Sequence, residues 1–262
     1  MRTKNLFPLL LLAALLAGPA MAAPEIDDII SQANNVAYYS GDDGRADVAM
    51  TILDNQGRTR ERLFTILRKD VEEGGDQLYF VYFKRPSDVR KTTFLVHKYM
   101  ERDDDRWMYL PGLDLVKRIA ASDQRTSFMG SHFFHEDLSG RHLDADHHAL
   151  LEENDTFYVI KNIPKEPASV EFASYTVWID KENFLPMKAE YLDKSGALYR
   201  TMEVLEVATV ADYPTVLKSR ISDLEAGGST VTRFSNIKYN LRLDENLFSE
   251  RYLRRPPREA RQ

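Results

Sequence analysis

The chain of 262 residues contains no cysteine. This absence excludes disulfide bonds and thiolate metal sites, and it removes the cysteine that would carry a lipid anchor. Long apolar runs are missing as well, because no segment reaches the roughly 20 apolar residues that are needed to span a membrane. We therefore expect the exported part of the chain to be soluble and unanchored.

An excess of basic residues is also missing. Lys and Arg number 35 and Asp and Glu number 41; without Arg2 and Lys4, which fall in a leader segment, 35 − 2 = 33 basic residues face 41 acidic ones, a net charge of −8. The sequence shows no long basic face. Nucleic acid is therefore not expected as a partner.

Residues 1–22 show the three parts of a secretory signal peptide. Two basic residues precede an apolar run over residues 9–17, and small residues stand before a cleavage site at Ala23. Cleavage there would leave 262 − 22 = 240 residues, a length that one all-β domain of about 200–250 residues accommodates. We expect a single domain over residues 23–253, located in the periplasm.

The spacing of apolar residues changes once along the chain. Apolar residues at helical spacing predict an amphipathic helix over residues 24–39. From Val48 onward the apolar period becomes two, which is typical of strands. Twelve segments bounded by turn-forming residues are predicted as strands: residues 48–52, 63–67, 78–83, 92–99, 106–110, 116–120, 156–162, 170–179, 185–192, 197–207, 215–224 and 229–239.

The turns between the later strands are short, so neighbours in sequence should pair antiparallel. Many antiparallel strands with few helices indicate a mainly β fold, a barrel or a sandwich, because so wide a sheet must curl or split. Residues 121–151 interrupt this pattern, and we interpret residues 146–151 as a short helix. Arginines surround two prolines after Leu253, and residues 254–262 are predicted to form a disordered basic tail.

Several strands are apolar on both faces. Residues 78–83 are all apolar or aromatic. A sheet that is packed on one side alternates in polarity, so both faces of this strand should meet apolar surroundings. The residues alone leave open whether these surroundings are a thick core or a cavity.

Two groups of side chains have residue types that occur in metal or catalytic sites. His132 and His135 lie three residues apart in a histidine-rich segment, but a zinc site needs three or four converging ligands and no zinc motif is present. Surface or core histidines are therefore the favoured interpretation, and we expect no cofactor. Ser131 beside His132, with Asp137 as orienting group, suggests a hydrolase, but the Gly-x-Ser-x-Gly elbow is absent. We expect no catalytic residue.

Four segments in the middle of the chain carry a resemblance to a known family: Trp107-Met108-Tyr109-Leu110-Pro111, Arg118-Ile119, Phe128-Met129-Gly130-Ser131 and Glu136-Asp137-Leu138. Together with Trp178-Ile179-Asp180 and Pro186-Met187-Lys188, they make the chain resemble the outer membrane lipoprotein-sorting proteins, the relatives of the lipoprotein carriers LolA and LolB. The subgroup that it resembles acts beside resistance-nodulation-division exporters. The chain departs from this pattern at Lys91-Thr92-Thr93, where similar proteins have a Gly-Thr pair.

The resemblance implies an open, incomplete antiparallel β-barrel of about eleven strands, whose open side is covered by helices over an apolar cavity. It implies a non-catalytic carrier, expected to be a monomer, that moves lipid or lipoprotein acyl chains between membranes or to an exporter. Its partners would be an inner-membrane exporter and an outer-membrane acceptor. For the cavity and its mouth we predict these residues: Phe80, Tyr82, Phe94, Trp107, Tyr109, Leu110, Arg118, Phe128, Met129, Phe133 and Trp178.

Arg118 is the predicted contact for a charged headgroup, since a guanidinium complements phosphate or carboxylate. The alternative is that Arg118 pairs with Glu136 or Asp137. Two other functions stay open: an interaction or sensor module that binds a partner protein, and a lipid hydrolase that uses Ser131 and His132.

Overall fold

The structure is a computed structural model that describes residues 24–262; the predicted signal peptide lies outside the described residues. The α-helices are α1 (Ile26–Tyr38), α2 (Arg251–Arg254) and α3 (Arg258–Arg261). Short 3-10 helices cover Pro111–Leu113, Ala121–Asp123, Glu136–Leu138, Leu143–Ala145, Pro167–Ser169 and Glu245–Phe248. The strands are β1 (Asp43–Asp54), β2 (Thr59–Asp70), β3 (Gln77–Arg85), β4 (Thr93–Lys98), β5 (Asp105–Leu110), β6 (Leu115–Ile119), β7 (Asp146–Glu153), β8 (Phe157–Pro164), β9 (Phe172–Asp180), β10 (Pro186–Asp193), β11 (Leu198–Val210), β12 (Tyr213–Asp223) and β13 (Gly228–Tyr239).

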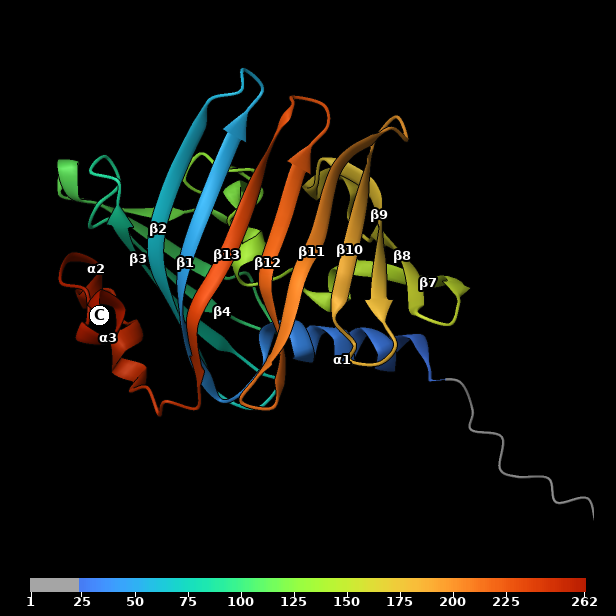
Figure 1. Cartoon of the computed structure of the whole chain (residues 1–262), viewed down its shortest axis with the longest axis horizontal. Coiled ribbons are helices and arrows are strands. Elements are labelled where there is room, and N and C mark those ends of the chain that lie inside the picture. The colour runs from blue at the N-terminus through green and yellow to red at the C-terminus, as the bar shows by residue number, and fades with distance from the viewer. Residues whose placement is uncertain (1–23) are drawn as a thin grey trace, which may run out of the picture.

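All thirteen strands form one antiparallel sheet in the order β6-β5-β4-β3-β2-β1-β13-β12-β11-β10-β9-β8-β7. Consecutive strands are neighbours in the sheet, except β6 and β7, which lie at its two ends. In addition β1 pairs with β13, for example through Met50 opposite Thr232. The sheet curves, and its outer strands bend behind the central ones (Figure 1). Its two ends, β6 and β7, do not pair with each other within the described residues, so the barrel is open. The predicted mainly β, open antiparallel fold is confirmed.

Helix α1 lies across the inner face of the sheet, where it packs on β8 and β9 (Figure 1). Ile29, Ile30 and Ala33 recur at helical spacing and are buried, because they form the apolar stripe that a surface helix turns toward the core. Two aspartates in the first turn favour the helix through its dipole. The predicted helix is therefore confirmed, with ends one or two residues inside the predicted ones.

Each of the twelve predicted strands overlaps an observed strand, and the thirteenth, β7, was missed. Residues 146–151 belong to β7 and not to a helix, so that prediction is wrong. The reason is that β7 ends the sheet and, among residues 24–262, pairs with β8 alone. Most of its side chains are exposed, and an exposed edge strand needs no apolar alternation.

The prediction of a disordered tail is also wrong. Residues 254–262 continue from α2 into α3 and lie against the outer face of the sheet, the face opposite α1 (Figure 1). Leu253 and Ala260 are fully buried. They join Leu67, Phe80 and Leu95 in one apolar cluster. Burial of these apolar side chains holds the segment in place despite its arginines.

No helix among residues 24–262 combines the length and the apolar character that crossing a bilayer requires.

Candidate functional site

A cavity of about 320 Å³ lies on the inner face of the sheet. Its floor is formed by β1, β2, β11, β12 and β13, and its cover by α1 and by the loop over residues 120–145, which we call the cover loop (Figure 1). The apolar side chains of the floor are Ala46, Val48, Met50, Phe64, Ile66, Met202, Val204, Val216, Phe234 and Ile237. The volume falls within the range of about 300–1,000 Å³ that is usual for small-molecule sites.

Strand periodicity decides which side chains reach the cavity. On β1, Val48 and Met50 alternate with polar neighbours and line the cavity. On β13, Thr232 and Phe234 face the same side, because they are the register partners of these two residues. The inner face is therefore apolar over the central strands, while the alternate residues of β13 point to the outer face.

The C-terminal end of α1 is held by Arg68 of β2, which also lines the cavity. The Arg68 guanidinium donates to the backbone oxygens of Tyr38, Ser40 and Gly41. Gln77 donates a further hydrogen bond of 2.8 Å to the Tyr38 oxygen. These donors satisfy carbonyls that a helix end leaves without intrahelical partners. Arg68 thereby fixes one edge of the cavity cover.

The cover loop is held to the sheet by ion pairs. Arg125 binds Glu136 within the loop and Glu171 at 2.6 Å. Arg200 of β11 binds Asp137 at 2.5 Å. Burial alone would raise the pKa of Glu171, but the hydrogen bonds from Arg125 bring it down to about 2. The carboxylate therefore stays charged, and the pair stays intact, throughout the physiological pH range.

A second polar cluster joins the cover loop to β4 and β5. Asp104 and Arg106 form an ion pair of 2.7 Å whose side chains are both 1% exposed. Lys98 donates to the Ser139 oxygen at 2.7 Å, and burial lowers the pKa of Lys98 to about 8. His142 reaches Asp104 at 3.3 Å. The loop is thus fixed at both ends and cannot fall onto the cavity floor.

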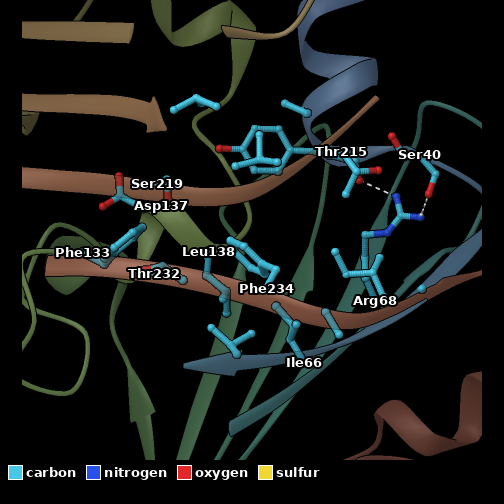
Figure 2. A pocket seen from close by; sticks show the side chains of 18 of the residues that line it. Ser40, Ile66, Arg68, Phe133, Asp137, Leu138, Thr215, Ser219, Thr232 and Phe234 are labelled. Atoms are coloured by element: carbon cyan, nitrogen blue, oxygen red, sulfur yellow. Dashed lines mark hydrogen bonds between the residues drawn. The ribbon is translucent and has the colours of Figure 1, made fainter. Parts of the chain in front are cut away.

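Polar groups stand at both ends of the cavity (Figure 2). Ser40, Arg68 and Thr215 lie at one end, beside the C-terminus of α1. Asp137, Ser219 and Thr232 lie at the other, beneath the cover loop. An apolar middle with polar ends suits an amphiphilic ligand.

The eleven predicted site residues fall in several places. Phe128 and Phe133 line the cavity. Phe94 and Met129 belong to the packed core beside it. Whether any of these four touches a ligand stays a prediction.

Four predicted aromatic residues lie on the wrong face of the sheet. Phe80, Tyr82, Trp107 and Tyr109 pack in the outer cluster under the C-terminal segment. They alternate with inner residues such as Val81, so they cannot reach the cavity. These side chains are apolar because residues 243–260 cover them. The sequence interpretation had placed residues 254–260 of this cover in a disordered tail.

The other three predicted residues do not line the cavity either. Leu110 ends β5, and Trp178 lies under Lys188, whose Nζ is 4.5 Å from the ring centroid. Arg118 is on the edge strand β6, where its side chain is 67% exposed and pairs with Asp105. The alternative that Arg118 pairs with Glu136 or Asp137 is wrong as well.

The suspected hydrolase residues have structural partners. The Ser131 hydroxyl donates to the Phe128 oxygen at 2.6 Å and accepts from the Phe133 backbone N–H at 3.1 Å. His132 Nδ1 lies 2.8 Å from the Thr230 hydroxyl. Ser131 and His132 therefore stabilise the turn of the cover loop and its contact with β13.

The histidines of this segment do not converge. His135 is 5% exposed and packs on Phe94 and Phe128, with ring centroids 5.2 and 5.5 Å away. His148 binds Asn162 at 2.7 Å. Within the described part of the chain, no group of three or more His, Cys, Asp or Glu side chains has the geometry of a metal site.

Sequence interpretation missed most of the floor. Val204, Val216 and Phe234 were within predicted strands, but nothing marked them as site residues. The available signal was the alternation along β1 and β11–β13, whose inward side chains are mostly small or aliphatic. The sequence interpretation assigned aromatic residues to the cavity instead, although such large side chains fill the space that a cavity requires.

An open antiparallel sheet that wraps an apolar cavity under a helix and a loop defines the LolA-like fold of lipoprotein-sorting proteins. A LolA superfamily protein from Nitrosomonas europaea matches with a TM-score of 0.68 at 21% identity, over 88% of this chain and all (100%) of that chain. The predicted resemblance to lipoprotein-sorting proteins is confirmed, whereas the exporter-associated subgroup stays a prediction.

A family model described as an uncharacterized protein matches residues 75–255, and the chain belongs to this family. It is similar to a DUF1329 family protein from Desulfovibrio piger, with 28% identity, a TM-score of 0.80, and coverage of 86% of this chain and 96% of that one. It is equally similar to a domain from Vibrio parahaemolyticus assigned to outer membrane lipoprotein sorting, with 28% identity, a TM-score of 0.80, and coverage of 87% and 97%. No curated protein matches the chain.

Proposed function

We propose that this protein binds the acyl chain of a lipid or lipoprotein in the cavity and carries it through the periplasm without catalysis. The observation that carries the proposal is the apolar cavity of about 320 Å³ between the central strands and their cover. The lipoprotein-sorting domain at 28% identity supports it, because the two chains share the fold over nearly their whole length.

The energetics of such a cargo are consistent with exchange between membranes. Burying about sixteen methylenes at ~0.8 kcal/mol each amounts to roughly 13 kcal/mol, which is similar to what the bilayer offers. A carrier needs this near parity, since a much stronger site would not release its cargo. The cavity holds part of such a chain, and the remainder would lie along its half-buried end near Val216 and Ile237.

The test is a titration with a fluorescent fatty acid. Val204→Trp puts a large side chain into the cavity and should weaken binding at least about tenfold. Leu205→Trp is the matched control, because Leu205 is 38% exposed and does not line the cavity. Equal binding by both variants would show that the ligand does not use the cavity.

A second candidate, docking of a partner such as an exporter, is favoured by the free edge of β7. Leu150 and Leu151 are 38% and 57% exposed on this edge strand. An exposed apolar edge is a ready site for an added strand. If this edge docks a partner, Leu151→Lys should abolish crosslinking to an exporter's periplasmic domain. Val207→Lys on β11 is the control and should leave crosslinking intact. Unchanged crosslinking in Leu151→Lys would exclude this edge as the docking site.

A further inference from the structure

The buried end of the cavity holds a hydroxyl group for which residues 24–262 supply no hydrogen-bond partner. Thr232 of β13 is 3% exposed and lines the cavity. Its Oγ1 has no hydrogen-bond partner among the described residues. A buried polar atom in this state is unfavourable, so native proteins rarely keep one without a reason.

A second hydroxyl lies next to it. Ser219 of β12 is the register partner of Thr232, and both side chains line the cavity. Side chains that are directly opposite on antiparallel strands have Cβ atoms about 4.5–5.5 Å apart. The two hydroxyls therefore form one polar patch on the cavity wall (Figure 2).

Asp137 of the cover loop adds an acceptor at the same end (Figure 2). Its Oδ2 accepts from the Phe134 backbone N–H at 2.7 Å and from Arg200 at 2.5 Å. Both of these hydrogen bonds end on Oδ2, which leaves Oδ1 to accept another. The buried end thus offers two hydroxyls and one carboxylate oxygen.

Met50 and Phe133 place apolar side chains beside this patch, and a ligand hydroxyl can take the place of water as its hydrogen-bonding partner. Met50 is the neighbour of Thr232 on β1, and Phe133 lies over the same end. Met50 is 3% exposed, whereas Val216 and Ile237 toward the other end are half-buried. A ligand that enters from the more exposed end reaches Thr232 with its apolar tip first.

We propose that Thr232, Ser219 and Asp137 form a subsite for a hydroxyl group on the apolar part of the ligand. The hydroxyl donates to Asp137 Oδ1 and accepts from Thr232 or Ser219. The protein would then select a hydroxylated lipid over the same lipid without the hydroxyl. This inference rests on the proposed function and specifies its cargo class.

The test compares two probes, dodecanoate and ω-hydroxydodecanoate, as competitors of a bound fluorescent fatty acid. The native protein should prefer the hydroxylated chain by about tenfold, as expected for a hydrogen bond to a charged group. The double variant Thr232→Val, Ser219→Ala should reduce this preference severalfold, because only the hydrogen bond to Asp137 Oδ1 remains. The control double variant Thr201→Val, Ser222→Ala changes another cross-strand pair, which does not line the cavity, and should keep the preference.

The outcomes separate the two proposals. Equal affinity of the native protein for both probes overturns the subsite and leaves acyl binding intact. Binding of neither probe overturns the proposed function itself. A preference that is unchanged in the Thr232→Val, Ser219→Ala variant overturns the assignment to these residues. Thermal melts check folding, and Thr232→Val alone serves if the double variant is unstable.

Discussion

One part of the inner face of the sheet is packed and another part is hollow. Phe64 and Phe83 meet Phe128 of the cover loop, and Phe94 packs on the same ring with centroids 5.3 Å apart. Over β11–β13 the inward side chains are shorter, such as Val204, and a cavity remains. The same sheet under the same cover thus makes a core or a cavity according to side-chain size.

The hollow part persists because the cover cannot collapse onto it. Ion pairs fix the cover loop to β11 and to the loop before β9, and Arg68 fixes the end of α1. Breaking a buried pair by removing one partner is strongly destabilising. The ion pairs therefore keep the space open while the aromatic cluster provides the stability.

Shortening a side chain should lower the free energy of unfolding more in the packed part than in the hollow part. Phe128→Ala, at a position 2% exposed among three aromatic rings, should lower the free energy of unfolding by about 3–5 kcal/mol. Met202→Ala should cost less than about 1.5 kcal/mol, because Met202 already borders empty space. Urea unfolding measures both, and equal losses would refute the distinction.

The packed part should also carry a dependence of stability on pH. Burial, together with nearby Arg106 and Lys117, lowers the pKa of His135 to about 4. The unfolded chain binds this proton near pH 6.5, so stability falls as the pH drops from 6.5 toward 4 and is retained above 6.5. At about 1.36 kcal/mol per pH unit, the loss between pH 7 and pH 5 is about 2 kcal/mol.

His135→Gln should flatten the pH dependence of urea unfolding over that interval, whatever its effect at pH 7. His147→Gln is the matched control, because His147 is exposed on β7 and should leave the slope unchanged. An unaltered slope in His135→Gln would exclude this histidine as the titrating group.

Widening the hollow part should have the smallest effect on stability. Phe234 lines the cavity and is half-buried. Phe234→Ala should lower the free energy of unfolding by about 1 kcal/mol and let a branched acyl probe bind as well as a straight one. Thermal melts and competition titrations check this prediction, and a loss of several kcal/mol would indicate that Phe234 is part of the packed core.

Regular elements were predictable from the sequence where burial leaves a periodic pattern. The inner strands show apolar alternation because one face is covered, and α1 shows the stripe at helical spacing. The edge strand β7 was not predictable in this way, because most of its side chains are exposed. The order of the C-terminal segment was missed because its arginines suggested a disordered tail. The burial of Leu253 and Ala260 depends on an outer face that only the folded sheet defines.

The site was harder to predict than the fold. Phe128 and Phe133 were placed near the cavity through the resemblance, whereas Trp107 was assigned to the wrong face. Strand alternation shows that two faces exist but does not say which one encloses space. A cavity is marked by small side chains such as Ser219, and small side chains give no distinct signal in a sequence.

The central claim is that the cavity binds acyl chains. Native mass spectrometry of protein purified from the periplasm without detergent, with lipid extraction of the same sample, tests it most directly. Discrete adducts that extract as lipid are expected on the native protein and should be absent from Val204→Trp. A native protein that stays free of adducts after incubation with membranes, or adducts that persist in Val204→Trp, would contradict it.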